Sequence, residues 1–583
     1  MEVRSLVRPG AYYDSLVLMQ LQQALSLLPG VVEVGVVMGT EANRGILERS
    51  GLVTEDLEAV RPDDLVVAIR GQSADAAVAA LARLDEFLCR TGSTGEREYV
   101  PKSLEMASRM LPSADWVLLS VPGLYASGVA RQALCLGKHV FLFSDHVALH
   151  EEAELKREAE RRGLLLLGPE CGTAIVGGVG FGFANRVKKG PVGLVSASGT
   201  GLQQVSCLVS RRSGVSHALG TGGRDLADEV GGVASVQGLD LLRRDPETRV
   251  IVLISKPPSV SVARRLLEEA RRAGKPVVVL FLGYAAPARR AGNLHFASTL
   301  EDAAGLAIEL AAHEEPSLAE IADSRANPSG NGDLCFARGQ RYLRGLYSGG
   351  TLAYEAQLLL WSHGLAVSTN DLASSDFRGS SAGRDAGPGH RVLDLGTEEF
   401  TQGRPHPMIS NDVRIRVLRQ EARDPEVAVI LLDVVLGDGA HPDPARELAS
   451  ACSQAVAEAR KSGRRLEVIA VVVGTEDDPQ GLESQVKLLE AAGIRVFMGN
   501  EAAVGHAASL ARALEECRPL GPPVPVPLTA LEPPAAALNV GLEWFAGSLQ
   551  AQGVPTLHVD WRPPAGGGDR LQGILRRMKG HGA

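Results

Sequence analysis

Two short stretches of the chain place hydroxyl side chains and glycines in the same order. SASGTGLQQV runs from Ser196 to Val205 after the apolar run PVGLV, and YSGGTLAYEA runs from Tyr347 to Ala356 after RGL. Each stretch predicts a strand, a Ser-Gly-Thr or Ser-Gly-Gly-Thr turn, and a helix. The N–H groups and dipole of a helix N-terminus attract anions, and glycine lets an anion approach the backbone closely. Binding of phosphate or carboxylate is therefore the chemistry that these turns favour.

The alternative for each turn is that its hydroxyl group only caps the helix that follows. Two copies at equivalent places favour a shared function, in which two helix N-termini hold one anion between them. The residues predicted to bind phosphate are Ser198, Gly199, Thr200 and Gly201 in the first turn and Ser348, Gly349, Gly350 and Thr351 in the second.

Three other segments add charged groups. GTGGRD offers Gly222, Gly223 and Arg224 as further phosphate ligands, and the alternative is a simple turn. Lys256 in SKPP is a candidate to bind an anion directly, or it is a surface lysine after a strand. Arg404 and His406 in TQGRPHPMI follow the strand VLDLG, where strand ends often meet ligands, or they belong to a loop stiffened by proline. Lys256, Arg404 and His406 are the predicted catalytic residues.

The cysteines argue against a metal site. The seven cysteines are scattered and form no CxxC pair, which predicts free thiols in a reducing compartment and no metal. Cys171 in GPECGT is interpreted as a structural thiol because no paired histidine is identifiable from the sequence.

The elements that carry these residues follow an α/β pattern. With 583 residues the chain is expected to form three or four domains. Short β-branched runs such as RVIVLIS, PVVVLFLG and VAVILLDVV predict strands buried on both faces of parallel sheets. Helical stretches such as VARRLLEEARRAGK lie between them, which is typical of strands alternating with helices.

An internal repeat indicates tandem domains. The corners Asp245-Pro246-Glu247 and Asp424-Pro425-Glu426 are each predicted to lie between a helix and a buried strand. Further along each repeat, ARRAGKPVVVLFLG matches LEAAGIRVFMGN, and STLEDAAGLAIEL matches GNEAAVGHAASLARAL. The predicted divisions are an N-terminal α/β region at 1–100, a region at 101–190, a first repeat domain at 191–315, a linker at 316–339, a second repeat domain at 340–517, a proline-rich connector at 518–534 and a small tail at 535–583.

The charge balance and the hydropathy exclude some classes of partner. The net charge is −9, which predicts no nucleic-acid partner. The start MEVRSLVRPG lacks the apolar core of a signal peptide, and no apolar run is long enough to span a bilayer. These features predict a cytoplasmic protein without a membrane partner.

Several of these motifs resemble the succinyl-CoA synthetases. GPVGLVSASGTGLQQV through GTGGRD and DPETRVIVLISK are similar to the α-subunit around its first phosphate-binding helix, and YSGGTLAYEA, VLDLG and RDPEVAVILLDVVLG are similar to the ligase domain of the β-subunit. DWVLLSVPGLYASGVARQALCLGKHVFLFSD resembles the end of the CoA-binding domain. The resemblance implies a Rossmann-like CoA-binding-type domain followed by two tandem flavodoxin-like succinyl-CoA-ligase domains with parallel sheets.

Nearly the whole chain resembles the FdrA family, on PGAYYDSLVLMQ, VMGTEANRGIL, LISKPPS, FLGYAAPA, GRPHPMI and VDWRPPAGG. That resemblance implies a subunit of oxamate carbamoyltransferase in allantoin breakdown, in which oxalurate and phosphate give oxamate and carbamoyl phosphate. It also implies partner subunits. Phosphate or carbamoyl phosphate is then the substrate, no cofactor is certain, and CoA binding is left open.

The synthetase resemblance is incomplete at the catalytic histidine. The phosphohistidine of the synthetases would fall near His295, and the glutamate that supports it aligns with Lys256. No ATP-grasp domain fits in the chain, and no Walker motif GxxxxGK[ST] occurs. Two alternatives to carbamoyl transfer therefore stay open. The first is an NDP-forming acyl-CoA ligase completed by a separate ATP-grasp chain, and the second is a scaffold without catalytic activity.

Overall fold

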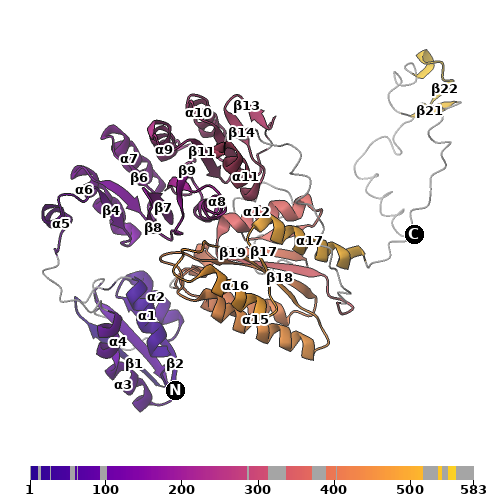
Figure 1. Ribbon diagram of the computed structural model, residues 1–583. Coiled ribbons are helices and arrows are strands. Elements are labelled where there is room, and N and C mark those ends of the chain that lie inside the picture. The colour runs from indigo at the N-terminus through magenta and orange to yellow at the C-terminus, as the bar shows by residue number, and fades with distance from the viewer. Residues whose placement is uncertain are drawn as a thin grey trace. The chain divides into compact units, whose positions relative to one another are not determined.

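In the computed structural model the chain divides into two units, Met1–Cys517 and Arg518–Ala583 (Figure 1). Described are residues 2–10, 13, 15–26, 28–52, 60–61, 64–91, 101–284, 286, 288–312, 336–370, 389–401, 404–516, 536–540 and 549–559. Most of the predicted linker 316–339 and all of the connector 518–534 lie outside these residues.

The N-terminal region forms a three-stranded antiparallel sheet in the order β1-β3-β2. This arrangement differs from the parallel pairing that the sequence pattern predicts. Its elements are β1 (Glu2–Arg8), α1 (Ser15–Ser26), β2 (Val31–Met38), α2 (Glu41–Arg49), β3 (Leu65–Gly71), α3 (Ala74–Ala82) and α4 (Leu84–Thr91). The sheet buries Val34, Val36, Val67 and Ile69 in one core with Leu21 and Leu25 of α1.

The next region forms a three-stranded parallel sheet in the order β4-β5-β6. Its elements are α5 (Leu104–Met110), β4 (Trp116–Leu119), α6 (Gly123–Cys135), β5 (His139–Leu142), α7 (Leu149–Arg161) and β6 (Leu166–Leu167). Alternating parallel strands and helices agree with the Rossmann-like pattern.

The first repeat domain is built on an eight-stranded sheet in the order β13-β14-β12-β11-β9-β10-β7-β8. The hairpin of β7 and β8 precedes residue 191 in the chain but joins this sheet, because β7 pairs antiparallel with β10. The elements are β7 (Thr173–Val176), β8 (Val179–Gly182), β9 (Lys189–Ser196), α8 (Gly199–Ser210), β10 (Val215–Gly220), α9 (Val233–Arg244), β11 (Val250–Ser255), α10 (Val260–Arg271), β12 (Val277–Phe281), β13 (Arg290–Ala291), β14 (Leu294–Phe296) and α11 (Leu300–Ala311).

The second repeat domain has a six-stranded parallel sheet in the order β16-β17-β15-β18-β19-β20. Its elements are β15 (Tyr342–Tyr347), α12 (Gly350–Ser362), β16 (Val367–Thr369), β17 (His390–Asp394), α13 (Glu398–Thr401), α14 (Asp412–Arg423), β18 (Val427–Val435), α15 (Pro444–Lys461), β19 (Glu467–Val473), α16 (Leu482–Ala491), β20 (Arg495–Phe497) and α17 (Asn500–Glu516). The fold class predicted for the two repeats, flavodoxin-like α/β with parallel central strands, is confirmed.

The two repeat domains share one hydrophobic core. Helices α8 and α11 of the first domain pack against α12 and α17 of the second, at the junction that Figure 1 shows between the two sheets. Buried side chains such as Leu202, Ala303, Leu352 and Ala507 belong to a single cluster. The relative placement of α8 and α12, which carry the two turns, is therefore set by apolar packing.

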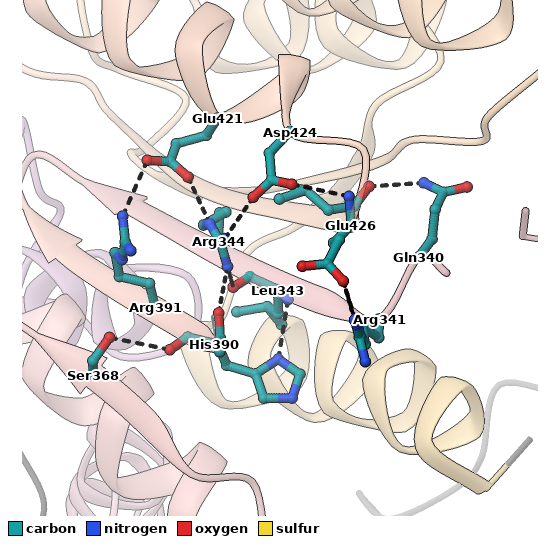
Figure 2. Close-up of polar contacts among 12 residues, drawn as sticks. Gln340, Arg341, Leu343, Arg344, Ser368, His390, Arg391, Glu421, Asp424 and Glu426 are labelled. Atoms are coloured by element: carbon teal, nitrogen blue, oxygen red, sulfur yellow. Dashed lines mark hydrogen bonds and ion pairs between the residues drawn. The ribbon is translucent and has the colours of Figure 1, made fainter. Parts of the chain in front are cut away.

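A buried ion network lies at the amino end of the second sheet (Figure 2). Arg344, which is 3% exposed, pairs with Glu421 at 2.6 Å and with Asp424 at 3.1 Å, and it donates to the carbonyl of Gly389. Arg391 also contacts Glu421. These pairs tie the last turn of α14 and its Asp-Pro-Glu corner to strands β15 and β17, at the sheet edge opposite the two turns.

Arg344→Met is expected to destabilise the protein by about 3 kcal/mol, because removing one partner of a buried pair leaves the other carboxylates uncompensated. Urea unfolding of the purified chain measures this loss. Arg341→Met is the matched control, because Arg341 pairs with Glu426 at a more exposed place in the same network and its replacement should cost much less. Equal losses in the two variants would contradict the structural role of Arg344.

The second unit contains the parallel pair β21 (Ala537–Val540) and β22 (Thr556–Val559). Among the described residues of both units, none of the helices is both long and apolar enough to cross a membrane.

Candidate functional site

The first turn leaves the N-terminus of α8 open. Ser198 caps this helix, because its Oγ accepts a hydrogen bond from the N–H of Gly201 at 3.1 Å. Gly199 is exposed, and a Cβ placed on it would meet no atom within 4 Å. Within the described residues no acceptor is recorded for the N–H groups of Gly199 and Thr200. The cap therefore leaves the N–H groups of Gly199 and Thr200 available at the start of α8, and their role in binding an anion stays a prediction.

The second turn is held by a buried carboxylate. Asp433 of β18, which is fully buried, accepts from the N–H and Oγ of Ser348, each at 2.8 Å, and from the N–H of Gly349 at 3.2 Å. Arg414 of α14 donates to the same carboxylate at 2.9 Å. Asp433 thus occupies amide groups that the sequence assigns to phosphate, and the two turns are not equivalent.

The two turns touch each other. Oγ of Ser198 and Oγ1 of Thr351 are 2.6 Å apart, and a Cβ placed on Gly349 would lie 2.8 Å from both Cβ and Oγ1 of Thr200. Direct contact between the turns therefore takes the place where one shared anion was expected. The structure does bring all eight turn residues together, and their role as phosphate ligands stays a prediction.

A cation and a second carboxylate lie at the N-terminus of α12. A Cβ placed on Gly350 would clash with Oδ2 of Asp394 and would lie 3.7 Å from Nζ of Lys256. Lys256 follows β11 in the first repeat domain, and its Nζ lies 5.5 Å from the centre of the Tyr354 ring of the second. The predicted anion-binding Lys256 therefore reaches the junction of the two turns.

His406 lies beside the same junction, whereas the Arg404 side chain is exposed. A Cβ placed on Gly396 would lie 2.9 Å from Nε2 of His406 and 3.2 Å from Oδ1 of Asp394. Burial, together with the nearby Arg414 charge, lowers the pKa of His406 to about 4. Nδ1 of His406 accepts from the N–H of Met408, so the neutral ring carries its proton on Nε2. In this state His406 is a hydrogen-bond donor rather than a base.

The segment GTGGRD forms a separate cluster. Arg224 contacts Glu152 at 3.0 Å and Glu170 at 3.7 Å, and it donates to the carbonyl of Val147. Lys156, fully buried, pairs with Glu152 and with Asp225 at 2.7 Å. Gly222 has a φ of +88° and packs against the carbonyl of Pro169, which a side chain would prevent. The predicted ligands Gly222, Gly223 and Arg224 thus belong to a loop with its own carboxylate partners.

Two further candidates are buried. His295 lies in β14 and is 5% exposed, and burial lowers its pKa. Cys171 donates to the carbonyl of Gly220, and burial raises the pKa of its thiol to about 12. A thiol of this kind is not a nucleophile, which agrees with the structural interpretation of Cys171.

A loop from the preceding region crosses the carboxyl edge of the second sheet. Asn185 donates to the carbonyl of Leu436 and to Asp478, and Arg186 pairs with Asp438. The Phe183 ring packs 5.9 Å from the ring of His406. This loop therefore places an aromatic ring beside His406.

Sequence reasoning missed Asp394, Asp433 and Arg414. Both aspartates stand in motifs noted for their strand pattern, VLDLG and VAVILLDVV. A charged residue inside an otherwise apolar strand is a signal, because buried charges are nearly always paired.

Family models match most of the chain. The CoA-ligase model matches residues 346–510, and the model of the succinyl-CoA ligase like flavodoxin domain matches residues 189–310. Residues 1–102 match a model described as AllF, heavy metal-associated domain.

The residues of this N-terminal region do not fit a metal. Cys89 is the single cysteine in 1–102, and the sequence between β1 and α1, PGAYYD, holds none. In the parts of the chain that the structure describes, no group of three or more His, Cys, Asp or Glu side chains gathers as metal ligands would.

Several curated proteins are similar in sequence. The ADP-forming sulfoacetate-CoA ligase subunit SauD of Bilophila wadsworthia is 29% identical over 185 residues, 30% of this chain and 61% of that protein. The α-subunit of the ADP-forming succinate–CoA ligase of Methanothermobacter thermautotrophicus is 27% identical over 195 residues, 33% of this chain and 64% of that protein. The apo structure of the dinucleotide-forming acetyl-coenzyme A synthetase 1 of Ca. Korarchaeum cryptofilum has 18% identity and a TM-score of 0.28, with 70% of this chain and 86% of that chain covered.

One curated relative is matched over nearly the whole of its own length. The Uncharacterized protein YahF of Escherichia coli K12 is 38% identical over 502 residues, which are 85% of this chain and 96% of that protein. Together with the matches to both ligase-domain models, this similarity confirms the resemblance found in the sequence: the chain belongs to the FdrA family of the NDP-forming acyl-CoA synthetase superfamily.

Proposed function

We propose that the chain is the subunit of a carbamoyltransferase that transfers a carbamoyl group between oxalurate and phosphate, together with partner chains. The observation that carries the proposal is the junction where the open N-terminus of α8, Lys256 and the neutral His406 gather around the second turn. The N-terminal match to a family model named for AllF and the membership in the FdrA family support it.

The reaction needs positioned charges more than a covalent intermediate. A phosphate oxygen bonds to the carbamoyl carbon of oxalurate, the bond from that carbon to the oxamate nitrogen breaks, and a proton passes from phosphate to that nitrogen. Oxamate and carbamoyl phosphate result. Negative charge develops on the carbamoyl oxygen, and a donor placed there stabilises the transition state.

The three predicted catalytic residues and the first turn each have a role in this step. Lys256 and the N–H groups of Gly199 and Thr200 bind phosphate. The Nε2–H of His406 donates to the carbamoyl oxygen. Arg404 pairs with the carboxylate of oxalurate.

Lys256→Met is expected to weaken phosphate binding about ten- to hundredfold, because a hydrogen bond to a charged group contributes about 1.5–3 kcal/mol. Isothermal titration with phosphate measures binding, and oxalurate cleavage by the complex with its partner chains measures turnover. Lys487→Met is the matched control, because Lys487 lies exposed on α16 and pairs with Glu483. Phosphate-dependent cleavage that survives in Lys256→Met would remove Lys256 from the site, and no cleavage by the wild-type complex would reject the function.

The relatives named as CoA-ligase subunits favour a second candidate, a ligase completed by a separate ATP-grasp chain. It predicts CoA binding at the Rossmann-like region and labelling of a histidine by radioactive ATP. The burial of His295 inside β14 weighs against this histidine as the carrier. A labelled histidine would favour the ligase over the transferase.

A further inference from the structure

The two repeat domains contact each other through a pseudo-twofold set of polar groups. Thr200 and Thr351 are equivalent in the repeated turns, and one helical turn later the equivalent residues are Gln204 and Glu355. Gln204 donates to the carbonyl of Met498, just before α17, and Glu355 accepts from the N–H of Leu300, the first residue of α11. Each helix that carries a turn thus reaches the start of the last helix of the other domain.

The last helices repeat this exchange. Glu301 of α11 accepts from the N–H of Ala502 in α17 at 3.2 Å, and Glu501 of α17 accepts from Oγ1 of Thr299, the cap of α11, at 2.7 Å. Glu301 also packs so closely on Gly499 that a Cβ there would clash with its carboxylate.

The symmetry is broken at one position, where the first domain has Gln204 and the second has Glu355. The Glu355 carboxyl group is 1% exposed, accepts from Leu300 at 2.7 Å and from Nδ2 of Asn500 at 2.9 Å, and lies in the field of Glu301 and Glu501. Three acidic groups from α11, α12 and α17 therefore share one interface.

We propose that Glu355 is a positioning residue whose uncharged carboxyl group holds the second turn against the first repeat domain, and that ionisation of this group weakens the contact. Glu355 lies on α12 four residues after Thr351, so a displacement of its carboxyl group acts on the helix that carries the turn. The contact between Ser198 and Thr351 depends on the same helix.

The surroundings of Glu355 are acidic or neutral. Glu301 and Glu501 face it from α11 and α17, Asn500 bonds it from α17, and the buried Tyr347 hydroxyl donates to Asn500 from β15. Arg211 lies near Glu301 and favours the charged form of that group. Burial raises the pKa of Glu355 to about 8 and outweighs the hydrogen bonds from Leu300 and Asn500, which favour the charged form. The charges of Glu301 and Glu501 also raise this pKa, so an ionised Glu355 meets like charges in this interface.

The sign of the pH effect follows from this direction. In the unfolded chain Glu355 releases its proton near its ordinary pKa of 4.5, whereas in the folded protein it keeps the proton up to about 8. Its contribution to stability is therefore full below pH 4.5 and is lost as the pH rises toward 8, by about a tenfold change in the unfolding constant per pH unit.

Glu355→Gln copies the residue that stands at the equivalent position of the first domain. Infrared difference spectra of the full chain, recorded across pH 8, should show loss of a protonated carboxylic acid in the wild type and no such loss in Glu355→Gln. The thermal midpoint should fall between pH 5 and pH 8 in the wild type and fall less in the variant. Glu490→Gln, on the exposed face of α16, should behave as the wild type. A wild-type spectrum without this loss would overturn the proposal.

Hydrogen–deuterium exchange tests the positioning role. In peptides that cover Leu300 and residues 348–356, the exchange rate of the wild type divided by that of Glu355→Gln should rise above pH 8. Taking this ratio at each pH removes the pH dependence of the intrinsic amide exchange rates. A ratio that stays constant with pH would show that Glu355 is a buried polar group without a positioning role. If Glu355→Gln does not fold, Gln204→Glu should introduce a new protonated acid and a steeper pH dependence at the mirror position.

The inference rests on the proposed function only where phosphate is concerned. Phosphate affinity should fall in the wild type as the pH passes 8 and should stay within about twofold in Glu355→Gln. At each pH the two proteins meet phosphate of the same charge, so a difference between them comes from the protein. If neither protein binds phosphate while the infrared and exchange results hold, the carbamoyltransferase proposal fails and the role of Glu355 stands.

Discussion

Asp433→Asn should lose about 3–5 kcal/mol of unfolding free energy, the largest effect expected from a single conservative change in this protein. The carboxylate accepts three hydrogen bonds from the second turn and balances the charge of the buried Arg414. Asparagine offers one acceptor oxygen and places an NH2 group against donors, so the arginine keeps an unpaired buried charge. Urea unfolding with Asp412→Asn, an exposed change at the start of α14, as control measures the difference.

A double variant separates the two tasks of Asp433. Asp433→Leu with Arg414→Met removes the ion pair while leaving the Ser348 and Gly349 amides without an acceptor. Stability should recover in part relative to Asp433→Asn, because a buried charge pair can be replaced by apolar groups at little cost. Full recovery would show that the turn needs no acceptor. A loss below about 1 kcal/mol in Asp433→Asn would contradict the role of Asp433 in holding the second turn and balancing Arg414.

Much of the fold could be predicted because its strands carry a simple physical pattern. Runs such as VIVLIS and VAVILLDVV are buried on both faces, and the repeated Asp-Pro-Glu corner comes before the same kind of strand in both domains. The antiparallel order of the N-terminal sheet could not be predicted from this pattern. Strands β2 and β3 are as apolar as the parallel strands, and only the pairing of β1 and β2 on either side of β3 shows that the sheet is antiparallel.

The candidate site could be predicted in part. The repeat placed Thr200 and Thr351 at equivalent turns, and the structure brings those turns into contact. Nothing local in the sequence shows that Asp433 would turn toward Ser348, because that bond depends on how β18 pairs with β15. GTGGRD was grouped with the turns on resemblance, whereas its Arg224 is engaged by carboxylates from another helix and loop.

The packing of the two turns explains why the repeat departs from exact symmetry. Ser198 and Gly349 are equivalent in the repeat, yet one caps its helix with a hydroxyl group and the other has no side chain. A hydroxyl group at both positions would crowd the junction, because Thr200 already fills the space beside Gly349. The loss of a side chain on one side therefore permits the close approach of the two helices.

Gly349→Ala tests this packing directly and should cost about 1–3 kcal/mol. Gly349 has φ −121° and ψ 115°, which alanine adopts without strain, so the cost comes from the new Cβ against Thr200. Because Cβ of Thr200 itself is too close, rotation of that side chain cannot relieve the contact and the helices must separate. Gly199→Ala is the matched control on the first turn, where a Cβ meets no atom within 4 Å.

The cycle of Gly349→Ala, Thr200→Ala and the double variant isolates the contact, since it removes the effects that each change has alone. Thr200→Ala deletes the Oγ1 and Cγ2 atoms that crowd the new methyl group and keeps Cβ, so the double variant should recover part of the loss and be more stable than the sum of the single changes allows. Urea unfolding supplies the stabilities, and phosphate-dependent oxalurate cleavage supplies the activities. Additive stabilities would mean that the turns do not press on each other in solution. A stable Gly349→Ala variant that lost cleavage would instead show that the catalytic geometry tolerates less separation of the two helices than the fold does.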